Sequence, residues 1–258
     1  METTKLVDAH AHLLPPWFEK HKIGAVIKRA KQNGVIGIVN SSSDPKTHDF
    51  GIEVAKTYSN VKIAIGLQPT IVSKKNYEIL RKYIDKNRDT VIAIGEVGLD
   101  YYWVKEEDKR EEQRQYFKKI IQYANETDLP LVIHSRNAET DCLELLEDAV
   151  VPVYLHSFEG NKDEIERAIG LGFYIGVPTA VGSRRNWRKV AQRTPLSHLL
   201  LETDSPFMPF KPDINPNEPL WIRDAAEYIA NLKGIELDVL ASKTTANAEK
   251  FFNTVFDP

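Results

Sequence analysis

Short apolar runs alternate with longer amphipathic segments along nearly the whole chain, and this alternation constrains the fold more than any other feature. Strands that alternate with helices build a parallel sheet. No G-x-G-x-x-G turn, the mark of a dinucleotide-binding open sheet, follows the first run. The apolar runs cover Leu6 to Ala9, Val35 to Val39, Val61 to Leu67, Val91 to Ile94, Leu131 to Ile133, Val153 to Leu155, Phe173 to Val177 and Leu199 to Leu201.

Eight repeats predict a closed (β/α)8 barrel of the α/β class, and the 258 residues match the roughly 250 typical of that fold. We expect one domain over residues 1–258. Two loops are expected to overhang its C-terminal face, the aromatic and acidic Tyr101 to Asp108 and the proline-rich Pro206 to Pro219. Helical spacing is found in Ile23 to Asn33, Asn76 to Asn87, Asp108 to Thr127, Asn161 to Gly170, Trp187 to Gln192, Leu220 to Leu232 and Leu237 to Thr254.

Six potential metal ligands stand at the ends of five of these runs. A barrel gathers the C-terminal ends of its strands around one pocket, so residues far apart in the sequence can meet there. Imidazole is the commonest protein ligand for metals, and a buried carboxylate is costly unless it is paired or binds a cation. We therefore predict a site for one or two metal ions. The six residues are His10, His12, Glu96, His134, His156 and Asp204.

Alternation along a strand supports this grouping. Residues two apart share a face, so Asp8, His10 and His12 are expected to point the same way, as are Ile94 and Glu96. One histidine at a strand end is more often a hydrogen-bonded core residue. Two successive strands that each end in histidine favour the metal interpretation. His21, His48 and His198 lack this context and are assigned no function.

Composition narrows the possible partners and compartments. The net charge is −3, which excludes a generic DNA-coating protein, so nucleic-acid binding must be local. Divalent cations in the site could supply much of the positive charge that faces a phosphate. No apolar run is long enough to span a membrane, and the N-terminus lacks the layout of a signal peptide. The one cysteine, Cys142, is interpreted as a buried core residue and fits a reducing compartment. We expect a cytoplasmic protein without membrane contacts, either a monomer or a weak homo-oligomer.

The chain resembles the TatD family of metal-dependent deoxyribonucleases, within the amidohydrolase-like barrel superfamily. The resemblance runs from Val7-Asp8-Ala9-His10-Ala11-His12 to Thr244-Thr245-Ala246-Asn247. It is carried most specifically by Gly95-Glu96-Val97-Gly98-Leu99-Asp100-Tyr101, Leu131-Val132-Ile133-His134-Ser135-Arg136 and Leu200-Leu201-Glu202-Thr203-Asp204-Ser205-Pro206.

The resemblance implies two divalent metal ions, Mg²⁺, Mn²⁺ or Zn²⁺, that share Glu96. His10, His12, Glu96 and Asp204 would hold one ion, and Glu96, His134 and His156 the other. Asp204 and Glu96 would be the catalytic carboxylates, with Asp204 as the base. The implied activity is cleavage of DNA, single-stranded or at 3′ ends, by a 3′ to 5′ exonuclease or an endonuclease that serves DNA repair or degradation.

Several positions depart from the family pattern. The family usually has histidine after the third strand, where this chain has Gln68, an amide that can hydrogen-bond a phosphate but cannot accept a proton as imidazole does. Ser157 and Glu159 replace the cysteine and serine that follow the sixth-strand histidine, and Asn137 replaces an aspartate. Glu159 adds negative charge near the expected phosphate site.

Substrate contacts are predicted at Gln68, Arg136 and Tyr101. Arg136 could hold a phosphate bidentately, and Tyr101 with its neighbours could stack on bases or simply pack the loop. Arg184, Arg185, Arg188 and Lys189 surround Trp187, either as a strand-tracking loop or as a solvated helix start.

Two other functions remain open. A metallohydrolase of the same superfamily could cut an ester, lactone or amide, because a two-metal site polarises a carbonyl as readily as a phosphoryl group and fold does not fix substrate. A metal-binding protein with little catalysis is the third possibility, and the intact set of six ligands counts against it.

Overall fold

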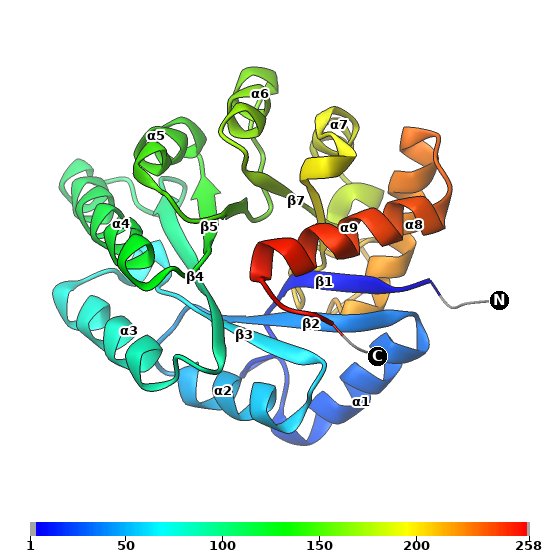
Figure 1. The fold of residues 1–258 in the computed structure, drawn as a ribbon, viewed down its shortest axis with the longest axis horizontal. Coiled ribbons are helices and arrows are strands. Elements are labelled where there is room, and N and C mark those ends of the chain that lie inside the picture. Colours follow the sequence, from blue (N-terminus) through cyan, green and yellow to red (C-terminus); the bar gives the residue numbers. More distant parts are fainter. Residues whose placement is uncertain (1–3, 257–258) are drawn as a thin grey trace.

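A computed structural model describes residues 4–256 and contains, within them, one sheet of eight parallel strands in sequential order (Figure 1). Consecutive strands pair from β1 to β8, and hydrogen bonds from Asp204 N to His10 O (2.9 Å) and from His12 N to Ser205 O (2.6 Å) join the last strand to the first. The predicted (β/α)8 barrel is confirmed. The strands are β1 Leu6–Ala11, β2 Val35–Ser42, β3 Val61–Ile65, β4 Val91–Asp100, β5 Leu131–Arg136, β6 Val153–Leu155, β7 Tyr174–Pro178 and β8 Leu199–Glu202.

Helices α1 to α8 surround the sheet (Figure 1). Local sequence sets several of their ends: Asn161 and Glu164 form a capping box at the start of α6, and Gly234 ends α8 with a left-handed φ of 65°. The helices are α1 Lys20–Gln32, α2 His48–Thr57, α3 Lys74–Lys86, α4 Glu107–Thr127, α5 Glu139–Leu145, α6 Lys162–Gly170, α7 Arg185–Arg193, α8 Ile222–Lys233 and α9 Leu237–Phe252, with short 3₁₀ turns η1 Pro69–Ile71, η2 Leu146–Asp148, η3 Thr179–Gly182, η4 Leu196–His198 and η5 Pro219–Trp221.

Strand β4 extends further than its apolar run indicates. β4 continues to Asp100, so Glu96 lies within the strand and not after it, and the register against β5 shifts between Gly95 and Val97. Ile94 packs in the cluster between sheet and helices, although Glu96 faces the barrel mouth. The expectation that Ile94 and Glu96 share a face is therefore wrong, because this bulge breaks the alternation.

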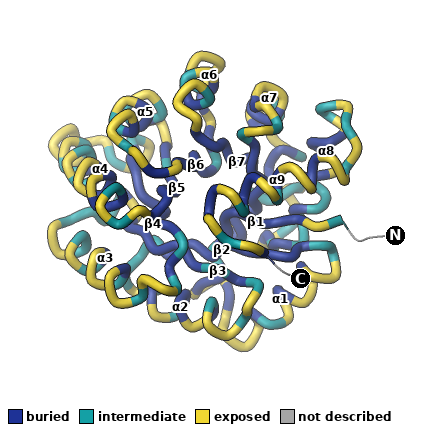
Figure 2. The backbone as a smooth tube through the Cα atoms, viewed as in Figure 1, coloured by how far each residue is buried: buried dark blue, intermediate teal, exposed yellow. Residues whose placement is uncertain are grey.

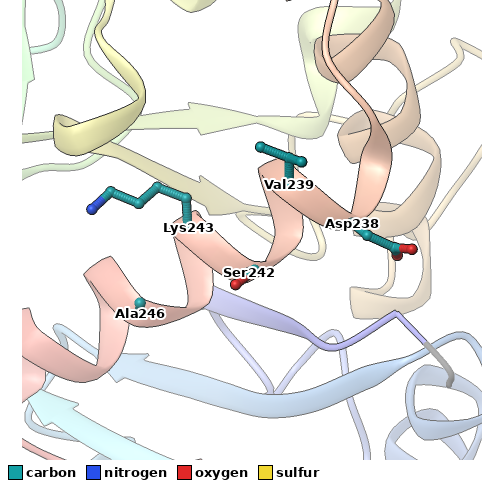
Figure 3. A pocket seen from close by; sticks show the side chains of 5 residues that line it. All are labelled: Asp238, Val239, Ser242, Lys243 and Ala246. Carbon is teal, nitrogen blue, oxygen red and sulfur yellow. The ribbon is translucent and has the colours of Figure 1, made fainter.

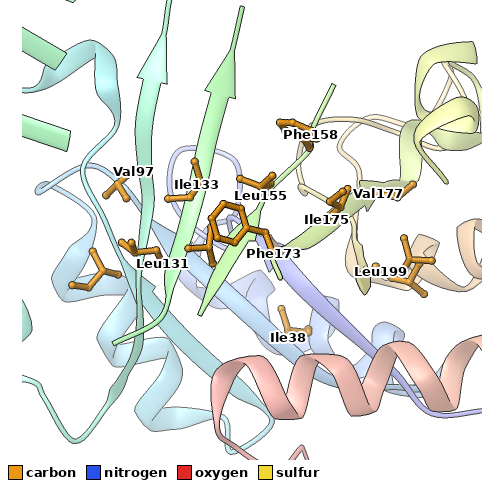
Figure 4. Close-up of a cluster of buried hydrophobic side chains, with 14 of the residues drawn as sticks. Ile38, Val97, Leu131, Ile133, Leu155, Phe158, Phe173, Ile175, Val177 and Leu199 are labelled. Atoms are coloured by element: carbon orange, nitrogen blue, oxygen red, sulfur yellow. The ribbon is translucent and has the colours of Figure 1, made fainter. Parts of the chain in front are cut away.

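Two apolar layers hold the barrel together. The larger layer lies between the strands and the surrounding helices, where Ile133, Leu155, Phe158 and Ile175 are fully buried (Figure 4). Figure 2 shows the same arrangement: the strands are buried and the outer surfaces of the helices are exposed. Cys142 belongs to this layer with no exposed surface, and its burial is confirmed. Most of the hydrophobic free energy of folding comes from such burial.

The smaller apolar layer fills the barrel and is closed by α9. Phe251 packs edge-to-face on Tyr154 and Tyr174, with ring centroids 5.6 and 5.7 Å apart. Asn247 Nδ2 donates to the carbonyls of Leu196 and Leu199 at the start of β8. α9 therefore covers the N-terminal end of the barrel, which leaves the C-terminal end open for a site.

The outer side of α9 carries a shallow hollow of about 500 Å³, lined by Asp238, Val239, Ser242, Lys243 and Ala246 (Figure 3). It lies far from the strand ends that carry the histidines. Within residues 4–256, no helix has the length and apolar character needed to cross a lipid bilayer.

Candidate metal centre

β1 delivers two imidazoles to the C-terminal mouth of the barrel. The Nε2 atoms of His10 and His12 lie 3.2 Å apart, and their outer nitrogens are both held by Ser41 at the end of β2. His12 Nδ1 lies 2.8 Å from the Ser41 carbonyl, which can only accept, so Nδ1 carries the proton and Nε2 offers its lone pair when the ring is neutral. The prediction that Asp8, His10 and His12 share one side is confirmed for the two histidines.

Alternation does not hold along the rest of β1. Val7 and Ala9 pack inside the barrel, whereas Ala11 packs outside it. The pairing with β2 is irregular between Asp8 and Ala11, which rotates the strand and lets His10 enter the mouth above the inner layer. Asp8 is fully buried and accepts hydrogen bonds from Thr203 N (2.9 Å) and Thr203 Oγ1 (2.6 Å).

β4 and β5 place a carboxylate against a third imidazole. His134 Nδ1 lies 2.6 Å from Glu96 Oε1, and its Nε2 lies 3.0 Å from Asp100 Oδ2. The opposite nitrogens of the ring thus face two carboxylates. The backbone of Glu96 is also held, because its carbonyl accepts a hydrogen bond from Leu67 N at 3.0 Å.

β6 and β8 complete the cluster. His156 Nδ1 donates to Glu202 Oε2 at 2.9 Å, and Glu202 also accepts from the Ser157 backbone and hydroxyl, both at 2.7 Å, and from Tyr154. Asp204 follows β8 in a left-handed conformation with φ of 53°. Such a conformation is disfavoured away from glycine, and it turns the carboxylate into the mouth.

The inward-facing atoms of the four imidazoles converge on Glu96 and Asp204. Glu96 Oε2 lies 3.7 Å from His12 Nε2 and 4.0 Å from His10 Nε2, and Glu96 Oε1 lies 3.9 Å from His156 Nε2. Asp204 Oδ1 lies 3.4, 3.8 and 3.7 Å from the Nε2 atoms of His12, His10 and His156. The barrel thus brings all six predicted residues together.

This donor set fits divalent cations. Asp204 Oδ1 is buried and has no hydrogen-bond partner among residues 4–256, and an orphaned buried carboxylate oxygen is costly without a cation. Glu96, Asp100, Glu202 and Asp204 are all buried within this small region. Two groups are arranged so that their donor atoms lie within 4.8 Å of one another: His10, His156 and Asp204, and His10, His12 and Glu96.

Proton affinities without a cation follow from the same geometry. Burial lowers the pKa of His134, but Asp100 and Glu96 outweigh it and raise the pKa to about 9. Burial also lowers the pKa of His156, but the carboxylates of Glu202 and Asp204 outweigh it and raise the pKa to about 10. The pKa of His10 is held well below its usual value, by burial and then by the neighbouring His156. Cations that bind here must displace protons from the imidazoles, so binding is coupled to pH.

The residues predicted to contact substrate lie at the same end of the barrel in different settings. Gln68 follows β3 with an exposed side chain, and its backbone N–H donates to the Ser43 carbonyl at 2.8 Å. Arg136 is exposed at the end of β5, with its Cζ 3.9 Å from the ring centroid of Tyr102. Tyr101 instead donates its hydroxyl hydrogen to Asp141 at 2.7 Å. Its polar atom is therefore already engaged.

The basic segment around Trp187 is not a uniform binding surface. Trp187 is buried with 1% of its surface exposed, so it packs the core and cannot stack on a base. Arg188 donates to the carbonyls of Val181 and Gly182 at 3.2 and 2.9 Å. Arg184 and Arg185 are exposed. Trp187 therefore does not fit a strand-tracking loop, and the exposed Arg184 and Arg185 match the solvated helix start.

The sequence reasoning missed the residues that orient the imidazoles. Ser41, Asp100 and Glu202 hold the outer nitrogens of four histidines, and partners of this kind fix the tautomer and ring orientation of metal-binding imidazoles. The only available signal was the position of Asp100 and Glu202 beside the predicted ligands.

A barrel whose strand ends gather imidazoles and carboxylates around an unpaired buried oxygen defines a class, the metal-dependent hydrolases built on (β/α)8 barrels. The comparisons with known proteins specify the family. The family model described as "TatD related DNase" matches residues 7–253, and this chain belongs to that family of metal-dependent hydrolases.

Individual relatives agree over nearly their full lengths. The human protein named deoxyribonuclease TATDN3 is 30% identical, with 96% of this chain and 94% of the relative covered. The metal-dependent hydrolase YabD of Bacillus subtilis is 32% identical, with coverage of 96% and 98%. The crystal structure of YjjV, a TatD homologue of Escherichia coli, superposes with a TM-score of 0.89 at 27% identity and covers 98% of this chain and 99% of its own.

Proposed function

We propose that this protein is a deoxyribonuclease that hydrolyses phosphodiester bonds with two divalent metal ions. The observation that carries the proposal is the convergence of four imidazoles on the carboxylates of Glu96 and Asp204, one oxygen of which is buried and unpaired among the described residues. The name of the human relative, a deoxyribonuclease, supports DNA as the substrate.

We assign the ligands as the resemblance implies. His10, His12, Glu96 and Asp204 would hold one cation, and Glu96, His134 and His156 the other. The opposed oxygens of Glu96 support a bridging role, because Oε2 faces His10 and His12 while Oε1 faces His134 and His156. Imidazole-rich sites suit Zn²⁺ or Mn²⁺ better than Mg²⁺, which prefers oxygen ligands.

The cations would supply a polarised phosphoryl group, an attacking water of lowered pKa and a stabilised leaving oxygen. Asp204 is the residue that we assign to accept the proton of the water as its oxygen bonds to phosphorus and the phosphorus–oxygen ester bond breaks. Glu202 and Asp100 keep the imidazoles oriented throughout. Catalytic roles are thus assigned to Asp204 and Glu96.

The net charge of the chain supports a substrate that makes few direct contacts with basic side chains. The net charge is −3, and the exposed cation at the mouth that the sequence predicted is Arg136, two residues from His134. We assign Arg136 and Gln68 to phosphate contacts. A single strand or a 3′ end fits a site at the mouth of a barrel better than a duplex, and we propose 3′ to 5′ cleavage.

The test is a cleavage assay on stripped and reloaded protein. The protein is treated with a chelator, reloaded with Mn²⁺, Mg²⁺ or Zn²⁺, and incubated with a single-stranded oligonucleotide labelled at its 5′ end. A ladder that shortens from the 3′ end is expected, and Asp204→Asn serves as the blank. Fragments of random length would indicate endonuclease cleavage instead.

Glu159 and Gln68 keep one alternative open, a metallohydrolase that acts on an ester, lactone or amide. Glu159 is exposed on the segment after β6 and adds a negative charge that a polyanion would have to approach. No digestion of DNA with any of the three metals, together with hydrolysis of a carboxylic ester, would replace the proposed substrate with this one.

A further inference from the structure

Exposed aromatic side chains gather at the end of the barrel that carries the metal centre. Among the described residues, four large aromatic side chains are markedly exposed: Trp17 at 54%, Tyr102 at 43%, Trp103 at 65% and Phe207 at 45%. All four lie in loops that follow β1, β4 or β8, the strands that contribute His10, Glu96 and Asp204. The large apolar side chains exposed elsewhere are aliphatic, at Val150, Leu171, Val239 and Val255.

Trp17 and Phe207 form a pair across the seam between β1 and β8. Their ring centroids lie 5.8 Å apart with an interplanar angle of 79°. An edge-to-face pair of this kind leaves a ring face available to a third planar group. Two exposed rings in contact leave apolar surface in water, which costs free energy unless a ligand covers it. Clusters of exposed apolar side chains therefore mark binding sites.

The pair is tied directly to the metal centre. The ring centroid of Phe207 lies 6.0 Å from that of His12. Phe207 N donates to Asp204 O at 2.7 Å, and its own carbonyl accepts from Asn217 Nδ2 at 2.7 Å. Phe207 is therefore held in place relative to both His12 and Asp204 by its backbone.

We propose that Trp17 and Phe207 are a stacking platform for the nucleobase adjacent to the scissile phosphate. The inference rests on the proposed function and specifies how its site grips a single strand. In a nucleotide only one sugar separates the base from the phosphate, so a phosphate at the cluster of His12 and Asp204 brings a base to the neighbouring rings. Every base has a π-face, so the platform accepts any sequence. A duplex keeps its bases stacked on one another, and the platform therefore favours single strands.

The first experiment measures binding without cleavage. Mn²⁺-loaded protein that carries Asp204→Asn, the blank of the cleavage assay, is titrated into two fluorescein-labelled single strands of equal length, one with bases and one abasic throughout, and the anisotropy is followed. Alanine substitutions that remove base stacking weaken binding roughly 5- to 150-fold per base. We expect Trp17→Ala and Phe207→Ala to weaken binding of the strand with bases by a factor in this range and to leave the abasic strand unaffected.

Control variants separate stacking from folding and from general apolar contact. Phe207→Leu keeps an apolar side chain without a π-face and should behave like the alanine variant, whereas Phe207→Tyr should restore wild-type binding. Val239→Ala removes an equally exposed apolar side chain from α9 and should leave both affinities unchanged. All variants should keep the wild-type melting temperature, because both aromatic side chains are about half exposed.

The proposal would be overturned if the Mn²⁺-loaded Asp204→Asn protein with both aromatic residues intact bound the two strands equally, or bound neither, or if adding Phe207→Leu left its binding unchanged. The cleavage assay with Mn²⁺ separates this outcome from failure of the proposed function. DNA cleavage that is equally fast on both strands in wild type and variants refutes the platform alone. Base-dependent binding without cleavage by any metal refutes the nuclease and leaves the platform as a nucleic-acid contact.

Discussion

Replacing Glu202 with glutamine tests whether the imidazoles are held in the tautomer that metal binding needs. Glu202 is fully buried, and its two oxygens accept from His156 Nδ1, the Ser157 backbone and hydroxyl, and Tyr154. A glutamine has nearly the same shape but replaces one oxygen with an NH₂ donor. In one orientation the NH₂ group meets His156 Nδ1, and in the other it meets Ser157 N.

Either orientation has a calculable cost. If the amide donates to His156 Nδ1, the ring proton must move to Nε2, which is the atom that faces Glu96 and Asp204. Loss of such an orienting partner typically weakens metal affinity or activity about 10- to 100-fold, or about 1.4 to 2.7 kcal/mol. If the amide instead meets Ser157 N, a buried donor is left unpaired at a cost of about 1–3 kcal/mol in stability.

The assay is a competition titration of Mn²⁺ or Zn²⁺ against a chromophoric chelator, paired with thermal unfolding of chelator-treated protein. We expect Glu202→Gln to fold, to bind metal at least tenfold more weakly and to lose activity in proportion. Glu227→Gln is the matched control, because Glu227 is half exposed in an ion pair with Arg223 on α8. Wild-type metal affinity in a folded Glu202→Gln protein would refute the assigned role.

Three further predictions address the bridging carboxylate, a buried histidine and the barrel floor. Glu96→Ala should lower metal content, measured by elemental mass spectrometry, together with activity, and full activity would contradict the two-metal assignment. Burial lowers the pKa of His48 to about 4. The stability contributed by neutral His48 should be present above about pH 6.5 and lost as pH falls towards 4, by up to about 3 kcal/mol, and His48→Asn should remove that part of the slope in denaturant titrations. Phe251→Ala should cost about 3–5 kcal/mol in denaturant unfolding, against little change for Val239→Ala.

The fold and the candidate site could largely be predicted because both depend on patterns within short segments of the sequence. Eight apolar runs mark strands wherever they occur, and a residue at the end of a run lies at the same end of a parallel barrel as every other strand end. His10, His134, His156 and Asp204 could therefore be grouped without knowledge of any contact between them.

Contacts between distant segments could not be predicted in this way. Ser41, Asp100 and Glu202 orient the imidazoles through side chains and carbonyls that meet only when neighbouring strands pair. The bulge near Gly95 that aims Glu96 into the mouth depends on the register between β4 and β5. The contact between Trp17 and Phe207 joins segments at opposite ends of the chain, and no local pattern indicates it.

The sequence by itself thus determined the barrel, the end at which its polar residues collect and the family that those residues indicate. Only the tertiary structure decided which nitrogen of each histidine faces inward, which carboxylate oxygen is left unpaired, and that Trp17 meets Phe207 beside His12. The physical reason is the sequence distance over which each kind of signal acts. Hydrophobic periodicity acts over a few residues, whereas a tautomer, an orphaned oxygen and a ring pair are set by atoms that barrel closure brings together from opposite ends of the chain.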